Sequence, residues 1–161
     1  TISHVALKYI SEPFYSGLKN ITFSLSEKET LVIDAPHLLE KSIATNDLVE
    51  LKSDTSFRWL GRIDNVINSG GYKIIPEKVE NEIAKLLDVP FFVFGIQDER
   101  LGEKLVLCIE VEKSEFDLNL LATVELNRFE IPKEVYTTKQ FARTETGKIQ
   151  RKKTIASLSL K

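Results

Sequence analysis

The pattern of hydrophobic and polar residues changes along the chain near residues 61–65. Before this point, short apolar runs are separated by Ser, Glu, Lys, Asp, Asn and Pro, which is typical of strands joined by turns. No amphipathic helix pattern is visible in this part. The sequence therefore predicts a small all-β unit over residues 1–63, with strands at Ile21–Leu25, Leu31–Ile33, Leu48–Leu51 and Phe57–Leu60.

Helical periodicity begins at Pro76. Proline suits the first position of a helix, because the N–H that it lacks would be unpaired there. The apolar residues that follow recur at i, i+4, i+7 and i+8, namely Val79, Ile83, Leu86 and Leu87. Just before this helix, Asn65–Ile67 and Tyr72–Ile75 are predicted to pair as a hairpin across Asn68-Ser69-Gly70-Gly71, because glycine supplies the positive φ of a tight turn.

The remaining sequence mixes strands and helices. Phe91–Ile96 and Leu105–Val111 are strongly apolar and predict two strands, and Glu134–Thr138 predicts a third. Asp117 is expected to cap a second helix, and a short basic helix is expected after the polar stretch RTETGKIQRK. Because the order is not a strict repeat of strand, helix and strand, the second part, residues 64–161, is predicted to be a compact α+β domain.

Composition and charge narrow the class of protein. The 161 residues are 42% hydrophobic and 29% charged, as in an ordinary soluble protein, and the net charge of -2 favours neither nucleic acid nor an anionic membrane surface. The apolar runs are too short to span a bilayer. The single cysteine, Cys108, is expected to be a buried hydrophobe, which fits a reducing cytoplasm. The first residue is Thr1 and not methionine, so we expect a fragment of a longer protein.

Two candidate sites carry acids or arginine, and each also has a purely structural explanation. Thr45-Asn46-Asp47 places a carboxylate beside a strand, where it can accept hydrogen bonds from ribose hydroxyls, although Asn-Asp pairs also close ordinary turns. The planar guanidinium of Arg62 presents paired N–H donors suited to ribose or phosphate oxygens, and Asp64 lies two residues further along the chain. The alternative for these two residues is a surface ion pair.

Two further candidates are a glycine pair and a lysine. Ser69-Gly70-Gly71 lets a ligand approach the backbone closely, or only closes a hairpin. Lys148 is a mobile cation that can meet a developing negative charge, or only a solvated lysine. Two histidines and one cysteine provide no metal site. A nucleic-acid patch is disfavoured because no aromatic residues interleave with the basic cluster Lys148, Arg151, Lys152 and Lys153.

The order and spacing of these segments resemble a known superfamily. The chain contains DLVEL, then GRIDNVINSGGYKIIPEKVE, then RTETGKIQRK. Together they resemble the C-terminal part of adenylate-forming enzymes, which include acyl-CoA synthetases, firefly luciferase and peptide-synthetase adenylation domains. TISHVALK, TNDLVEL and WLGRIDNVINSGG most resemble the o-succinylbenzoate–CoA ligases of menaquinone biosynthesis.

The resemblance implies a role for each candidate residue in the first part of the chain. Asp47 and Arg62 would bind the ribose of AMP and ATP, and Asp64 would be the hinge about which a small C-terminal domain turns. The sequence departs from the family at Asn46, where glycine is usual. Asparagine tolerates the left-handed region, so the turn is expected to survive.

The resemblance also assigns the two sites in the second part. Ser69, Gly70 and Gly71 would form the loop that lines the channel for the pantetheine arm of CoA. Lys148 would be the catalytic residue that bridges the substrate carboxylate and the α-phosphate during adenylation. One lobe would then serve two steps: it would present Lys148 for the first and, after a swing about the hinge, the glycine loop for the second.

The implied enzyme is an AMP-forming acid–thiol ligase that uses ATP, Mg2+, CoA and a small carboxylic acid. The large ATP-binding domain that would hold most of the ATP and Mg2+ is not in this chain, so the fragment alone is expected to be inactive. Other aryl- or fatty-acyl-CoA synthetases, or an adenylation domain that loads a carrier protein, remain alternatives. An alternative of another class is a non-catalytic docking module. Exposed apolar surface on the β unit would favour self-association, so a homo-oligomer is left open.

Overall fold

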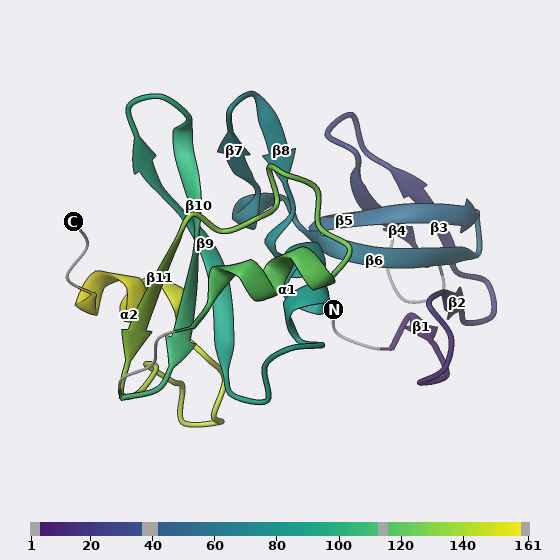
Figure 1. The fold of residues 1–161 in the computed structure, drawn as a ribbon. Helices are drawn as coiled ribbons and strands as arrows, with labels where there is room; N and C mark the ends of the chain where they lie inside the picture. Colours follow the sequence, from purple (N-terminus) through teal and green to yellow (C-terminus); the bar gives the residue numbers. More distant parts are fainter. Residues whose placement is uncertain (1–3, 37–41, 113–115, 159–161) are drawn as a thin grey trace. The chain divides into compact units, whose positions relative to one another are not determined.

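The computed structural model describes residues 4–36, 42–112 and 116–158 (Figure 1). Contacts within the chain divide it into two compact units, Thr1–Asn65 and Val66–Lys161. The boundary falls where the hydrophobic pattern changes in the sequence. The combination of an all-β unit with a unit of strands and helices confirms the predicted α+β class.

The first unit is a six-stranded sheet in which every neighbouring pair is antiparallel, in the order β1-β2-β6-β5-β4-β3. Its strands are β1 (Ala6–Leu7), β2 (Tyr15–Gly17), β3 (Thr22–Leu25), β4 (Thr30–Asp34), β5 (Ile43–Ser53) and β6 (Ser56–Arg62). A 3₁₀ helix, η1 (Ile63–Asn65), follows β6. Inward-facing residues of these strands form one core, which includes Phe23, Leu31, Ile33, Val49 and Phe57.

Strand β5 is much longer than predicted. The apolar run Leu48–Leu51 lies inside it, but the strand already begins at Ile43 and includes the polar residues Thr45, Asn46 and Asp47. The hydrophobic pattern did not indicate this extension, because pairing with β4 and β6 is made by backbone groups. Asp47 therefore lies within a strand, directly opposite Arg62 of β6.

The second unit is built around strand β10 (Gly102–Glu110). Strand β9 (Phe91–Asp98) pairs antiparallel along one edge of β10, and β11 (Glu134–Thr138) pairs parallel along the other. The hairpin of β7 (Ile67–Ser69) and β8 (Tyr72–Ile74) joins at the Gly102 end of β10.

Alternate residues of β9 and β10 pack into two cores on opposite faces of the sheet. One core holds Val93, Leu105 and Leu107 under helix α1 (Pro76–Ile83), whose Val79 and Ile83 are fully buried. The other core holds Phe92, Phe94 and Cys108 and is covered by Phe141, together with Ile155 of helix α2 (Arg151–Ser157). Burial raises the pKa of the Cys108 thiol to about 12.

Of two local predictions for the second unit, the structure corrects one and confirms the other. The hairpin turn has two residues and not four, because Ser69 pairs with Tyr72 and only Gly70 and Gly71 lie between them. Asp117 caps the second helix as predicted, since its carboxylate accepts a 2.9 Å hydrogen bond from Asn119 N, and this helix, η2 (Leu118–Thr123), is a 3₁₀ helix.

Candidate functional site

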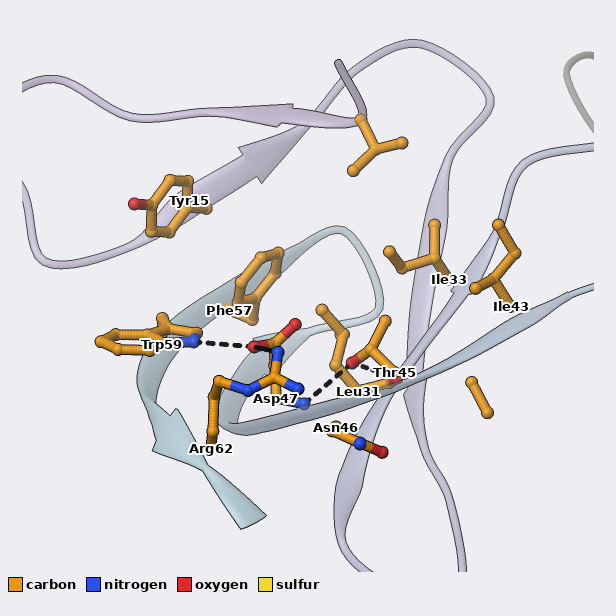
Figure 2. A pocket seen from close by; sticks show the side chains of 12 residues that line it. Tyr15, Leu31, Ile33, Ile43, Thr45, Asn46, Asp47, Phe57, Trp59 and Arg62 are labelled. Atoms are coloured by element: carbon orange, nitrogen blue, oxygen red, sulfur yellow. Dashed lines mark hydrogen bonds and ion pairs between the residues drawn. The ribbon is translucent and has the colours of Figure 1, made fainter. Parts of the chain in front are cut away.

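Asp47 and Arg62 lie together in the first unit. Each occupies one of two paired strands, and their Nη1 and Oδ1 atoms are 3.6 Å apart. Trp59 Nε1 donates a 3.2 Å hydrogen bond to the same carboxylate oxygen of Asp47. Figure 2 shows the Trp59 indole and the Arg62 guanidinium near the Asp47 carboxylate. The arrangement leaves lone pairs of the acid available to a ligand hydroxyl.

A pocket of about 850 Å³ opens beside this acid. Its polar wall carries Asp47, Trp59 and Arg62, and its apolar wall is formed by side chains of the sheet such as Ile33 and Phe57 (Figure 2). The Thr45 hydroxyl stabilises the wall, because it donates to Leu31 O at 3.0 Å and accepts from Asp47 N at 3.1 Å. A ligand with a sugar edge and a flat apolar part would fit this combination of walls.

Asp64 accepts hydrogen bonds from side chains of the same two strands, β5 and β6. Arg62 Nη2 donates to Asp64 Oδ2 at 2.9 Å, and Asn46 Nδ2 donates to the two Asp64 oxygens at 3.0 and 3.3 Å. Arg62 thus contacts both acids, Asp47 and Asp64. The contributions of Trp59 and of the Asn46 amide were not predicted from the sequence. The available signal in the sequence was a tryptophan, which carries an N–H donor, three residues before Arg62.

The glycine pair forms a tight turn with a bare outer surface. Gly70 and Gly71 have φ of +58° and +82°, and two positive φ values define the type I′ turn of a two-residue hairpin. Gly70 N donates to Leu101 O at 2.9 Å, which ties the turn to the Gly102 end of β10. A Cβ atom on Gly71 would meet nothing within 4 Å, so this glycine is needed for its φ value and the space beside it is open.

Substituting alanine for Gly71 is expected to lower the free energy of unfolding by about 1 kcal/mol, because an L-residue is strained at positive φ. Gly71→Asn should cost less, because asparagine visits that region more readily. Chemical denaturation of the chain and of both variants measures the difference. Equal stability of the alanine variant and the parent chain would show that the turn relaxes to another conformation.

Lys148 lies in a second tight turn, residues 144–148, which is called the Lys148 turn below. Arg143 and Ile149 form an antiparallel bridge, Thr144 N donates to Lys148 O at 2.9 Å, and Gly147 has φ +82°. The Lys148 backbone N–H also donates to the Thr144 hydroxyl at 3.1 Å. The side chain is exposed, and no hydrogen bond or ion pair of its ammonium is found among residues 4–36, 42–112 and 116–158.

The two turns lie at opposite ends of strand β10. The glycine turn adjoins Gly102, the first residue of β10. The Lys148 turn lies near Glu110, the last residue of β10, because Arg143 just before the turn donates a hydrogen bond to the Glu110 carboxylate. A nine-residue strand rises about 3.3 Å per residue, so the two ends are roughly 25 Å apart. In Figure 1 the β7–β8 hairpin and the yellow-green turn before α2 lie at the two ends of β9 and β10. The site residues thus form three groups, one in the first unit and two in the second.

Within the described part of the chain, no group of three or more His, Cys, Asp or Glu side chains is placed to hold a metal ion. In the same residues, no helix is long and apolar enough to cross a membrane.

Comparison with known proteins identifies relatives of one kind. No protein-family model matches the chain. An oxalate–CoA ligase of Arabidopsis thaliana is 33% identical over 113 residues, which cover 67% of this chain and 22% of that protein. A 2-succinylbenzoate–CoA ligase of Listeria monocytogenes is 30% identical over 112 residues, covering 68% of this chain and 24% of the relative. The matched region is therefore about a fifth to a quarter of the length of these relatives.

Solved structures agree with these relatives. An AMP-forming acyl-CoA synthetase/AMP-acid ligase II-like protein from Dyadobacter fermentans is 36% identical, with a TM-score of 0.56 over 98% of this chain and 48% of that one. The o-succinylbenzoate coenzyme A synthetase of Bacillus subtilis, solved with ATP and a magnesium ion, has a TM-score of 0.72 over 87% of this chain and 35% of its own, at 17% identity, which supports the fold alone.

Proposed function

We propose that this chain, whose homologues and structural neighbours are AMP-forming acyl-CoA ligases, belongs to an ATP-dependent acid–CoA ligase and corresponds to the C-terminal part of such an enzyme. The reaction has two steps. In the first, a carboxylate oxygen attacks the α-phosphorus of ATP, the bond from this phosphorus to the bridging oxygen breaks, and pyrophosphate leaves. In the second, the CoA sulfur attacks the acyl carbon, the thiol proton is lost, and AMP leaves.

The observation that carries this proposal is the placement of two unlike groups on one compact unit. Lys148 offers an exposed ammonium at one end of β10, and Gly70 and Gly71 offer bare backbone at the other. The first step needs a cation near the phosphate and the carboxylate, where negative charge develops. The second step needs a narrow passage for a thiol-bearing arm, for which backbone without side chains is suited.

Asp47 and Arg62 are proposed to hold the ribose of the nucleotide. The Asp47 carboxylate would accept hydrogen bonds from the ribose hydroxyls, and Arg62, whose Nη1 is 3.6 Å from Asp47 Oδ1, would orient the acid. Trp59 Nε1 donates to the same carboxylate oxygen of Asp47. Magnesium, when bound, would neutralise charge on the ATP phosphates, but the donor groups described here do not form a site for it, and we assign it to none of these residues.

Asp64 is proposed as the pivot between the adenylation and thioester steps. It lies in the 3₁₀ helix η1 at the boundary of the two units, directly after the ribose-binding pair. A pivot needs only a few residues that absorb the change in φ and ψ. The hydrogen bonds from Arg62 and Asn46 hold the Asp64 side chain beside the proposed nucleotide site.

The acid is proposed to be o-succinylbenzoate, which would place the enzyme in menaquinone biosynthesis in the cytoplasm. Support comes from the sequence resemblance and from the Listeria relative. A short dicarboxylic acid is the second candidate, because the Arabidopsis relative acts on oxalate and is 33% identical. Pyrophosphate release by the full-length gene product, measured with ATP and each acid in turn, tests the proposal. Release with none of the aryl, dicarboxylic or fatty acids, with or without CoA, would contradict it.

A further inference from the structure

The Lys148 turn is held at its base by two arginines, one on each side. Arg143 precedes the turn and Arg151 follows it, and each forms an ion pair with a largely buried glutamate on a different element of the second unit. These acids, Glu110 and Glu80, lie outside the residues proposed above to act on nucleotide, acid or CoA.

On the first side, Glu110 at the end of β10 makes three bonds to the segment that leads into the turn. Its Oε1 accepts from Phe141 N at 2.6 Å, and its two oxygens accept from Arg143 Nη1 and Nη2 at 2.5 Å each. This is the bidentate arrangement in which arginine and carboxylate are most directional. The hydrogen bonds from Arg143 lower the pKa of the Glu110 carboxyl, so the acid is ionised at neutral pH.

On the second side, Glu80 of helix α1 links three elements. One oxygen accepts from Val93 N of β9 at 2.9 Å, and the other accepts from Arg151 Nη2 at the start of α2 at 2.7 Å. The Arg151 guanidinium also lies 5.5 Å from the centre of the Phe92 ring. Burial raises the pKa of the Glu80 carboxyl, and the charge of Arg151 opposes that rise.

The turn needs external support of this kind. Helix α2 has only seven residues and no side-chain cap at its N-terminus, and helices this short are marginal without tertiary contacts. The Lys148 ammonium has no partner among the residues that the structure describes. The region that this ammonium can reach is therefore set by the backbone that carries the side chain.

We propose that the Glu110–Arg143 and Glu80–Arg151 pairs are positioning residues that hold the Lys148 turn in the orientation that adenylation requires. This inference rests on the proposed role of Lys148. A catalytic group displaced by about 1 Å can lose a hundredfold in rate. The two pairs act on adenylation alone, because the glycine turn lies at the other end of β10.

The test uses Arg143→Gln and Arg151→Gln in the full-length gene product. Each variant should lower kcat for pyrophosphate release by about tenfold to a hundredfold, with KM for ATP changed by less than about twofold. Thioester formation from preformed acyl-adenylate should change by less than about twofold. In the chain itself, hydrogen exchange at the amides of Thr144, Gly147 and Lys148 should become faster, because these N–H groups close the turn.

Controls separate positioning from stability. Lys139→Ala breaks the exposed Lys139–Glu112 pair, whose atoms are 3.2 Å apart, and should change neither rate nor exchange. Arg143→Lys keeps the positive charge but lacks the planar guanidinium that binds a carboxylate bidentately, so its adenylation rate should lie between those of Arg143→Gln and the parent enzyme. If an arginine variant unfolds, Glu80→Gln replaces it, since the amide oxygen can still accept from Val93 N.

The outcomes distinguish this inference from the proposed function. Normal adenylation in both arginine variants, in an enzyme that Lys148→Ala disables, would overturn the positioning role and leave the proposed function intact. Slow adenylation without faster exchange in the turn would also overturn it. Full adenylation by Lys148→Ala would instead refute the role of the lysine on which the inference rests.

Discussion

Replacing Lys148 with alanine should lower the rate of pyrophosphate release by about a hundredfold to a thousandfold, the usual loss when one group that stabilises transition-state charge is removed. The exposed ammonium has no competing partner among the described residues, so its removal leaves the rest of the turn intact. Thioester formation from preformed acyl-adenylate should fall by less than about fivefold. Separate assays of the two half-reactions in the full-length gene product measure both effects.

Lys152→Ala is the matched control for this experiment. Lys152 is exposed, lies four residues further along the chain and carries the same charge, so the variant has the same net charge as Lys148→Ala. It should retain the adenylation rate of the parent enzyme. Equal losses in the two variants would mean that general electrostatic attraction of ATP, and not a specific position, explains the effect.

Asp64→Pro should impair thioester formation by more than about tenfold and leave adenylation within about threefold of the parent rate. Proline fixes φ and removes the backbone N–H, which would restrict the change in backbone conformation expected of a pivot. Single-turnover transfer of the acyl group to CoA measures the first rate, and pyrophosphate release measures the second.

Asp64→Ala distinguishes the backbone of Asp64 from its side chain. Alanine removes the bonds from Arg62 and Asn46 but leaves φ and ψ free, so both half-reactions should stay near the parent rates. If alanine slows CoA transfer as much as proline does, the carboxylate and not backbone freedom is what matters at this position. Unimpaired transfer in the proline variant would remove the pivot assignment.

The hydrophobic pattern predicted the fold where packing follows directly from periodicity. Pro76 begins α1, and Val79 and Ile83 are fully buried, as their helical spacing indicates. Strand β11 was predicted at its observed bounds, Glu134–Thr138. The pattern failed where backbone pairing alone defines an element, as at the polar start of β5 and in the two-residue turn at Gly70 and Gly71.

The site was predictable only in part, because its contacts join residues distant in sequence. The pairing of Asp47 with Arg62 follows from the register of β5 and β6, which no spacing in the sequence reveals. The same holds for Glu110 with Arg143 and for Glu80 with Arg151, which are 33 and 71 residues apart. The roles of the candidate residues came from the resemblance, since each motif alone is also an ordinary structural feature.

The burial of Cys108 has a practical consequence. Its thiol is 0% exposed and has a pKa of about 12, so it should not react with maleimide or iodoacetamide at neutral pH. This chain has no other cysteine. Pairs of cysteines introduced at exposed positions of the two units could therefore be labelled with fluorophores without background from this thiol, and energy transfer between the dyes would test whether the two units move as proposed.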